Sequence, residues 1–197
     1  KELCVTCLEA RQKRGPIIKR EPHSCRNPDC AFGTDLHFDV VYATSPDIQI
    51  NLYQITCVDE KTTAPQVALT KTRGTVIADA IIAMYESIRI KGGNAPKSFT
   101  IDRCGELFNT KVRDYFKSKT GNELRCSNTE RPWENGLAEK MQDTIWNCAR
   151  ADLKFAALPY TFRGLAVLNA AGALLHRPCK RLKEKLPLHF ITEKPPT

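Results

Sequence analysis

The spacing of the hydrophobic residues changes along the chain, and this change restricts the fold more than any other feature of the sequence. Residues 36–43 and 52–59 alternate apolar with polar side chains and are rich in β-branched and aromatic residues, which predicts two neighbouring strands. Residues 76–90 instead show helical spacing, with one apolar row made of Ile77, Ile81, Met84 and Ile88. The other expected elements are strands at 67–70, 98–102 and 123–126 and helices at 110–119, 134–155 and 161–176. Strands first, then strand–helix alternation, then helices predict an α/β sandwich whose mixed sheet is covered by helices on both faces.

The chain has 197 residues, of which 42% are hydrophobic, so it is long enough for one packed domain and a small appendage. We expect a distinct N-terminal zone at 1–33, a core domain at 34–178 and a C-terminal extension at 179–197. No apolar run reaches the roughly 18 residues that a membrane-spanning helix needs, so no membrane partner is expected. The net charge of +8 favours a polyanionic partner. Basic clusters near both ends fit solvated faces and phosphate contacts about equally well.

The chain contains nine cysteines, an odd number that does not suit a disulfide framework. A reducing, intracellular compartment fits better. The five cysteines that stand singly in the sequence are then expected to be small core residues: Cys57, Cys104, Cys126, Cys148 and Cys179. The others lie with His23 in the first 33 residues, and they are Cys4, Cys7, Cys25 and Cys30. A short zinc-stapled module and a mobile arm both fit this segment.

Three acidic residues occupy positions that are poor choices for a carboxylate on structural grounds alone. Asp39 lies inside an expected strand, Asp102 ends another, and Glu139 lies near the start of the long helix. Burying a carboxylate costs several kcal/mol unless a cation compensates, and three carboxylates brought together would need a divalent metal. Oxygen ligands of this kind select Mg²⁺ or Mn²⁺. Taken singly, each acid is explained as well by an ordinary hydrogen-bonding role, and spacing alone leaves the choice open.

The sequence around these acids resembles the three catalytic blocks of copia-type retrotransposon integrases. The first block is His37-Phe38-Asp39, the second spans residues 101–108 with Asp102, and the third spans residues 131–139 and ends in Asn-Gly-Leu-Ala-Glu. The family reads approximately His-x-Asp, then Asp-x-Gly-x-Glu-Phe, then Asn-Gly-Val-Ala-Glu. The 62 residues between Asp39 and Asp102 and the 36 between Asp102 and Glu139 suit this pattern, with one residue more than usual in the second gap. Residues 147–153, 175–178 and 186–195 resemble later segments of the same family.

This resemblance implies a ribonuclease-H-like three-layer fold and an Asp-Asp-Glu triad of Asp39, Asp102 and Glu139 that binds two Mg²⁺ or Mn²⁺ ions. The implied activity is 3′-end processing and strand transfer, by which retroelement cDNA ends are joined to target DNA. The implied setting is the nucleus, and joining two DNA ends implies at least a dimer.

The N-terminal zone carries a further resemblance. Cys4-x-x-Cys7 resembles the end of the zinc-binding module that precedes the integrase core in this family. The two histidines of that module would lie upstream of the first residue. Cys25 and Cys30 would complete a four-thiolate zinc site with this pair, with His23 as a substitute ligand. Otherwise Cys4 and Cys7 have no further zinc ligands, and the segment is a mobile arm.

The long helix is expected to present one face to DNA and another to the core. Its DNA face would hold Glu139, Gln142, Asp143, Trp146 and Arg150, and its core face Leu137, Met141, Ile145 and Cys148. Lys140 and Arg150 would contact phosphates. For Trp146 we expect a packing contact rather than a contact with DNA, by a small margin.

Two departures from the family pattern bear on activity. Asp143 reverses the charge usual one turn after the catalytic glutamate, which should weaken DNA binding there. Arg103 follows Asp102 where a small or amide residue is usual, and it would either compete with the metal or hold a phosphate. A decayed or domesticated copy that only binds nucleic acid or protein therefore stays as an alternative, as does a ribonuclease-H-type nuclease that only hydrolyses.

Overall fold

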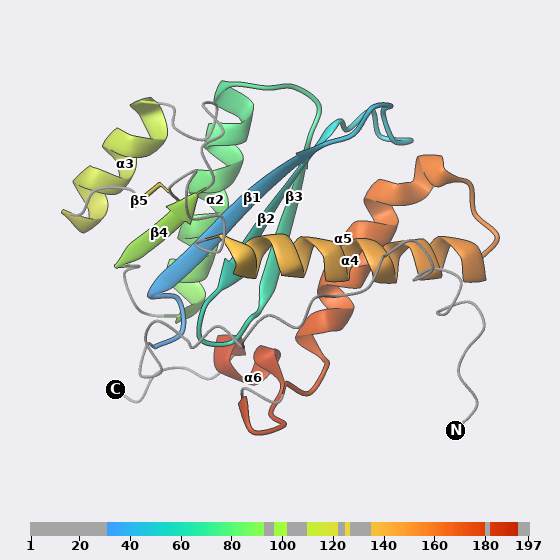
Figure 1. Ribbon diagram of the computed structural model, residues 1–197. Helices are drawn as coiled ribbons and strands as arrows, with labels where there is room; N and C mark the ends of the chain where they lie inside the picture. The colour runs from blue at the N-terminus through green and yellow to red at the C-terminus, as the bar shows by residue number, and fades with distance from the viewer. Residues whose placement is uncertain are drawn as a thin grey trace.

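A mixed sheet forms the centre of the molecule (Figure 1). The computed structural model describes residues 31–92, 97–101, 110–121, 125–126, 135–179 and 182–192. The strands are β1 (Asp35–Tyr42), β2 (Tyr53–Asp59), β3 (Pro65–Thr70), β4 (Ser98–Ile101) and β5 (Arg125–Cys126). They form one sheet in the order β3-β2-β1-β4-β5. β2 is antiparallel to both β1 and β3, whereas β4 is parallel to β1 and β5 is parallel to β4. The expected mixed sheet is confirmed.

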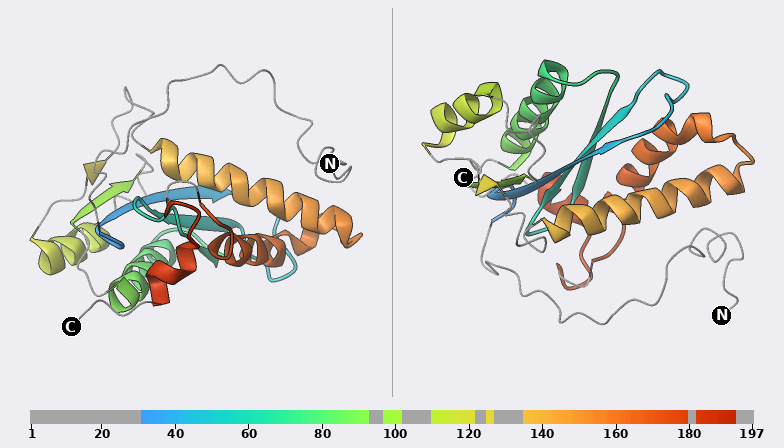
Figure 2. Two further views of the ribbon diagram at one scale, coloured as in Figure 1. Left: turned by 90° about the horizontal axis from the view of Figure 1, so that it is seen from below. Right: turned by 45° about the horizontal axis from the view of Figure 1, so that its top comes forward.

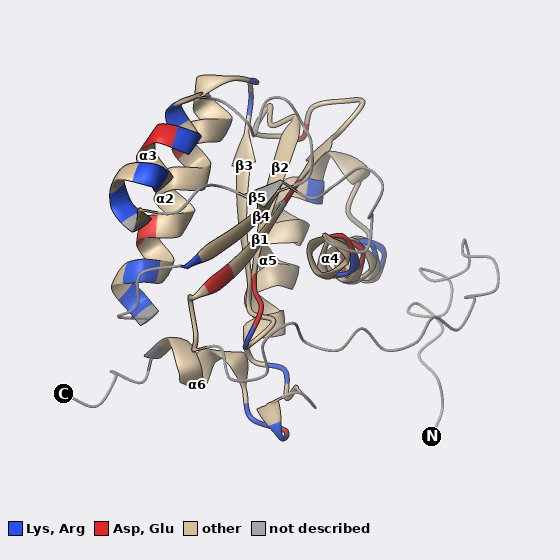
Figure 3. Cartoon of the chain, turned by 60° about the vertical axis from the view of Figure 1, so that its left-hand side comes forward, with Lys and Arg blue, Asp and Glu red and all other residues tan. Residues whose placement is uncertain are grey.

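Helices cover both faces of this sheet, as the sequence predicts (Figure 2). They are α2 (Thr75–Gly92), α3 (Thr110–Thr120), α4 (Gly136–Phe155), the 3₁₀ helix η2 (Tyr160–Phe162), α5 (Arg163–Leu175) and α6 (Pro187–Thr192). α2 and α3 lie on one side of the sheet and α4 lies on the other (Figure 3). The sequence did not predict α6, because a single short turn of helix that begins at a proline shows no usable periodicity. No helix in the described ranges is long and apolar enough to cross a membrane.

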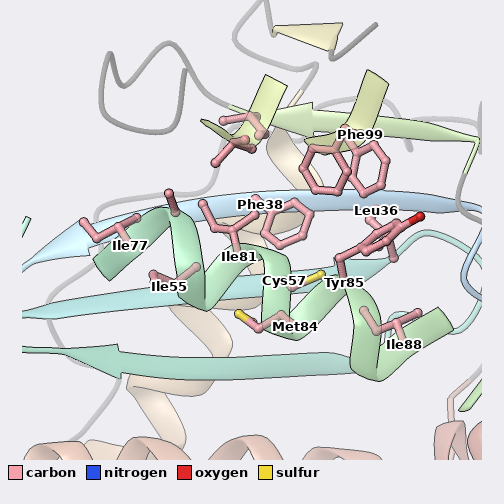
Figure 4. Close-up of a cluster of buried hydrophobic side chains, with 14 of the residues drawn as sticks. Leu36, Phe38, Ile55, Cys57, Ile77, Ile81, Met84, Tyr85, Ile88 and Phe99 are labelled. Carbon is pink, nitrogen blue, oxygen red and sulfur yellow. The ribbon is translucent and has the colours of Figure 1, made fainter. Parts of the chain in front are cut away.

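The main core lies between the sheet and α2 (Figure 4). The predicted helical row of Ile77, Ile81, Met84 and Ile88 is buried there, which confirms the expected face. Phe99 of β4 and Phe116 of α3 stack with ring centroids 4.0 Å apart, and Tyr85 of α2 meets the Phe116 ring edge-on at 5.0 Å. Offset and edge-to-face pairs of this kind add to the free energy gained by burial alone.

Cys57 is one of the isolated cysteines, and it is a fully buried, free thiol in this core. Burial raises the pKa of the Cys57 thiol well above its ordinary value, and the nearby Asp59 carboxylate raises it further. The thiol therefore stays protonated and unreactive. The expectation of a small core residue is confirmed for Cys57, whereas Cys148 and Cys179 are only partly buried.

A second, smaller core joins α4 to α5 on the other face of the sheet. Ile145, Ala149 and Leu153 of α4 meet a row of small residues on α5, which consists of Ala166, Val167, Ala170 and Ala171. Small side chains let two helices approach closely, so the packing of α4 is set by shape as well as by apolar area.

α3 is clamped to α2 by polar contacts at the surface. The hydroxyl of Tyr115 donates a hydrogen bond to Glu86, and Lys111 Nζ lies 2.5 Å from Asp79 Oδ1. Burial and the Glu86 acceptor raise the pKa of Tyr115 to about 12, so the hydroxyl remains a donor at neutral pH. The two helices therefore behave as one unit on this face.

The aromatic stack under α3 should be a main source of stability. Phe116→Ala removes a fully buried ring and is expected to lower the free energy of unfolding by about 3–5 kcal/mol, because a cavity remains. Phe155→Ala is the matched control, since this ring is 84% exposed and its loss should change stability by no more than about 0.5 kcal/mol. Urea unfolding of both variants measures the difference, and similar losses would contradict the core described here.

The contact between Tyr115 and Glu86 should make stability depend on pH. Hydrogen bonds from Tyr115 and from Arg89 lower the pKa of the Glu86 carboxyl in the folded chain. Such a group stabilises the fold above its unfolded pKa of about 4.3 and loses this contribution as the pH falls through its folded value. The stability lost in Tyr115→Phe should therefore be larger near pH 6 than near pH 3. Tyr42→Phe, at an exposed ring, should show no such difference when both are unfolded in urea.

Candidate active site

β1 places Asp39 on the face of the sheet that α4 covers. Leu36 and Phe38 point into the core under α2 (Figure 4). Because side chains alternate along a strand, His37 and Asp39 point to the opposite face. Asp39 lies opposite Thr56 of β2 in the antiparallel ladder and is partly exposed. Its carboxylate therefore lies at the boundary between the sheet, α4 and solvent.

The first turn of α4 is attached to β1 by Asn135. This residue precedes the helix, is only 2% exposed, and donates a hydrogen bond of 3.0 Å from its side-chain Nδ2 to the carbonyl oxygen of Phe38. Its own carbonyl accepts the backbone N–H of Glu139 at 3.2 Å. Asn135 therefore links the strand residue directly before Asp39 to the helical turn that carries Glu139.

A second polar anchor lies one turn further along α4. Gln142 is buried, and its side-chain oxygen accepts hydrogen bonds from the hydroxyl of Thr56 and from Gln54 Nε2, the latter at 3.0 Å. Thr56 is the residue that pairs with Asp39 across β1 and β2. The second anchor thus ties the helix to the strand beside Asp39.

Glu139 lies between these two anchors, in the first turn of α4, and is exposed. The anchors fix both the position of the helix along the sheet and its rotation about its own axis. As a result, β1, which carries Asp39, and α4, which carries Glu139, are held together by hydrogen bonds that lie next to both residues. Two of the three predicted carboxylates are therefore brought to one region of the α4 face.

The third predicted ligand, Asp102, lies outside the described residues, as does Arg103. Ile101, which precedes Asp102 in the sequence, ends β4 and pairs with Phe38 in the parallel ladder. Within the described ranges, no three His, Cys, Asp or Glu side chains form a group that could hold a metal ion. The possible zinc ligands Cys4, Cys7, Cys25 and Cys30, with His23, also lie outside the described residues.

His37 shares the sheet face of Asp39 and is buried. Its Nε2 lies 3.2 Å from Glu60 Oε2, and its Nδ1 has no hydrogen-bond partner within the part of the chain that the structure describes. His37 also pairs with Thr100 of β4. The Glu60 carboxylate thus holds the imidazole of His37, which lies two residues before Asp39 and fills the sheet face next to it.

The outward face of α4 differs in part from the predicted one. The buried row is Ala138, Gln142, Ile145, Ala149 and Leu153. Gln142 was expected to face DNA and is instead buried, because two alanines in this row bring the helix close enough for its amide to reach β2. Of the predicted core face, Ile145 is fully buried, whereas Leu137, Met141 and Cys148 are only partly buried.

Lys140, Asp143 and Arg150 are exposed, so the two side chains predicted to contact phosphates and the acid between them all face solvent. Arg150 Nη2 donates to Asn147 Oδ1 of its own helix at 2.6 Å. Trp146 is partly buried and stacks on Tyr160, with ring centroids 6.4 Å apart. The packing role considered for Trp146 is therefore the one that the structure shows.

The buried amide network is the part of the site that sequence reasoning missed. Gln54 and Thr56 lie in a strand whose residues are all buried, so two polar side chains at alternate positions were a usable signal. Their partner, Gln142, is 88 residues from Gln54 in the sequence, and no local pattern connects them. Asn135 was read only as part of a motif.

The arrangement favours chemistry with a hard cation. Carboxylate oxygens at Asp39 and Glu139 are the donors that Mg²⁺ and Mn²⁺ prefer. These carboxylates lie beside the hydrogen bonds of Asn135, Gln142 and Thr56, which hold α4 against β1 and β2 without adding charge. Among the described residues, Asp39 and Glu139 thus supply two carboxylates of the kind that a divalent metal binds, and Cys57 is buried on the other face.

Comparison with known proteins bears on the fold alone. No protein-family model matches the chain, and no curated protein sequence matches it. Solved structures do match. The trimeric form of the HTLV-2 integrase catalytic core domain in complex with magnesium superposes with a TM-score of 0.60 at 16% identity, over 82% of this chain and 97% of that one.

Two further structures agree with this. The simian T-cell lymphotropic virus intasome in complex with PP2A regulatory subunit B56 gamma gives a TM-score of 0.64 at 14% identity, over 84% of this chain and 57% of the other. The dimeric form of the HTLV-2 core gives 0.51 at 18% identity, over 74% and 88%. The chain therefore has the α/β, ribonuclease-H-like fold found in retroviral integrase catalytic cores.

Proposed function

We propose that this chain is the catalytic core of an integrase that cuts and joins DNA strands with the help of divalent metal ions. The observation that carries the proposal is the hydrogen bond from Asn135 to the carbonyl of Phe38, which holds the turn of Glu139 against the strand of Asp39. The fold supports it, since the three structures compared above are two forms of an integrase core, both in complex with magnesium, and an intasome. The sequence blocks favour the copia type within this class.

The proposed triad is Asp39, Asp102 and Glu139. Asp102 directly follows Ile101, and Asp39 directly follows Phe38. Ile101 and Phe38 pair with each other in the parallel ladder between β4 and β1. Two Mg²⁺ or Mn²⁺ ions bound by these carboxylates would activate the attacking oxygen and neutralise charge at the phosphorus. The attacking oxygen would come from water in end processing and from a DNA 3′-hydroxyl in joining.

The remaining roles fall to residues around the carboxylates. Asn135 and Gln142 keep Glu139 in place, while Lys140 and Arg150 on the exposed face of α4 would contact phosphates. Arg103, next to Asp102 in the sequence, would hold a phosphate as well. Because such contacts read the backbone, target choice should depend little on base sequence.

The proposed partners are retroelement cDNA ends and target DNA. Joining two ends calls for at least a dimer, and the proposed setting is the nucleus. A zinc ion at Cys4, Cys7, Cys25 and Cys30 is part of the proposal as a support for the N-terminal zone rather than for the reaction.

A second candidate is a copy that has kept the fold but lost the reaction. The observation that favours it is Asp143, which is exposed on α4 one turn from Glu139 and repels phosphates where the reaction needs them. Such a protein would bind nucleic acid or protein without turnover.

Replacement of the helix carboxylate is the direct test. Glu139→Gln should lower metal-dependent joining on a preassembled branched DNA by more than about 100-fold, beyond the effect usual for residues that only support a metal ligand. Asp143→Asn is the matched control on the same helix face, and it should keep activity and bind DNA at least as well. Activity of wild type and variants is followed with Mg²⁺ and with Mn²⁺.

Each other result has a distinct meaning. Equal loss in both variants would show that Glu139 contributes only charge to the helix. Cleavage without joined products would favour a nuclease that only hydrolyses. A folded wild-type chain that binds DNA but is inactive with both metals would favour the second candidate.

The anchor at Asn135 should affect activity more than its small contribution to stability suggests. Asn135→Ala removes one hydrogen bond, which contributes about 1 kcal/mol to stability. By releasing the turn of Glu139 it should lower joining by about 10- to 100-fold and raise the metal concentration needed for half-maximal rate. Asn169→Ala is the control, because this exposed amide donates only to Asp152 at the surface. An unchanged metal requirement in Asn135→Ala would contradict the role of the anchor.

A further inference from the structure

The exposed charge on α4 is balanced, although this helix carries the proposed reaction. Its basic residues are Lys140, Arg150 and Lys154, and its acidic residues are Glu139, Asp143 and Asp152. A face without net charge attracts DNA weakly, since counterion release from the phosphates supplies most of the affinity of such proteins. The positive charge that holds a duplex must therefore come from another part of the surface.

Among the helices in the described ranges, α3 carries such an excess (Figure 3). Its basic residues are Lys111, Arg113, Lys117 and Lys119, against the single acid Asp114. All four basic side chains are exposed. α3 lies at the β4–β5 end of the molecule, and α4 begins at its end nearer to α3 and runs away from it (Figures 1 and 2).

Arg113 and Lys117 form the central pair of this surface. They are four residues apart, so they lie on the same side of the helix about 6 Å apart along its axis. Val112 and Phe116, on the neighbouring side, are fully buried, which fixes the rotation of the helix. Lys111, in the first turn of the same helix, pairs with Asp79 of α2 at 2.5 Å.

The pair is presented on a rigid support. Phe116 stacks on Phe99 of the sheet, and Tyr115 donates a hydrogen bond to Glu86 of α2. Cations on a fixed helix lose less freedom when they bind than cations on a loop. This is a difference between α3 and an ordinary charged surface helix, whose long side chains are merely solvated.

We infer that Arg113 and Lys117 of α3 form a phosphate-binding surface that holds the backbone of a DNA duplex outside the reacting region. The inference rests on the proposed function for the identity of the polyanion. The surface binds phosphates irrespective of base sequence, and it supplies the positive charge that α4 lacks. The duplex engaged at the start of α4 thus continues past the sheet edge where α3 lies.

The test is the salt dependence of DNA binding by the full chain in Ca²⁺, which suppresses turnover. Fluorescence anisotropy with a labelled duplex is measured over a series of NaCl concentrations for wild type and for the double variants R113Q/K117Q, K140Q/R150Q and K183Q/K185Q. Removal of two phosphate contacts should reduce the slope of log affinity against log salt by about 1.8, and weaken binding uniformly across sequences. The exposed pair Lys183 and Lys185 is the charge-matched control and should leave the slope unchanged.

The outcomes separate this inference from the proposed function. If wild type binds the duplex and R113Q/K117Q keeps the wild-type slope, the α3 surface is wrong while the integrase proposal stands. A larger loss in K140Q/R150Q than in R113Q/K117Q also overturns it, since α4 would then dominate. Wild type that binds no DNA but binds vesicles of anionic lipid overturns both. Thermal unfolding of each variant confirms that it is folded.

Discussion

The position of Glu139 depends on amide side chains buried between α4 and the sheet. An apolar interface would allow the helix to slide or rotate at little cost, because hydrophobic attraction has no direction. A buried amide left without a partner costs about 1–3 kcal/mol, so any shift that breaks the contacts of Asn135 and Gln142 is opposed. These residues bind neighbouring strands, at Phe38 and at Thr56. The helix is thus held in one position against the sheet. Glu139 lies between the two anchors, so its position is fixed as well.

Local patterns made most of the fold predictable, whereas the contacts that shape the site are long-range. The alternation in β1 and β2 can be predicted because the apolar residues are the ones that are buried. The same holds for the row from Ile77 to Ile88 in α2. Gln142 was assigned to the wrong face because a glutamine is polar in any periodicity analysis. Whether such a side chain is buried depends on a partner in another element, here Gln54 and Thr56 of β2. The positions of Asp39 and Glu139 in the expected elements mark them as unusual acids, but only the match to a family pattern favours them as a site.

The distribution of charge separates the reacting region from the regions that can attract a polyanion. Carboxylates that bind metal ions repel phosphates until the ions are present, so neighbouring acids such as Asp143 increase the need for positive charge elsewhere. The exposed cations of α3 lie on a helix whose buried side is aromatic and whose contact with α2 runs through Tyr115. In the proposed function, attraction and reaction thus belong to different helices, and each can change without disturbing the packing of the other.

The distant end of α4 also constrains the site, because a helix of 20 residues is a lever about 30 Å long. A tilt of about 10° around its midpoint would move Glu139 by roughly 2 Å, which is enough to separate the proposed metal ligands. Trp146 stacks on Tyr160, and Arg163 at the start of α5 donates hydrogen bonds to the carbonyls of Ser45 and Asn51 in the loop after β1. Gly164 permits this approach, since a Cβ there would collide with Asp47 of the same loop. The connection between α4 and α5 is therefore attached to the loop that follows β1. The start of α4 is attached to β1 itself through Asn135, so both ends of the helix are held by β1 or by its loop.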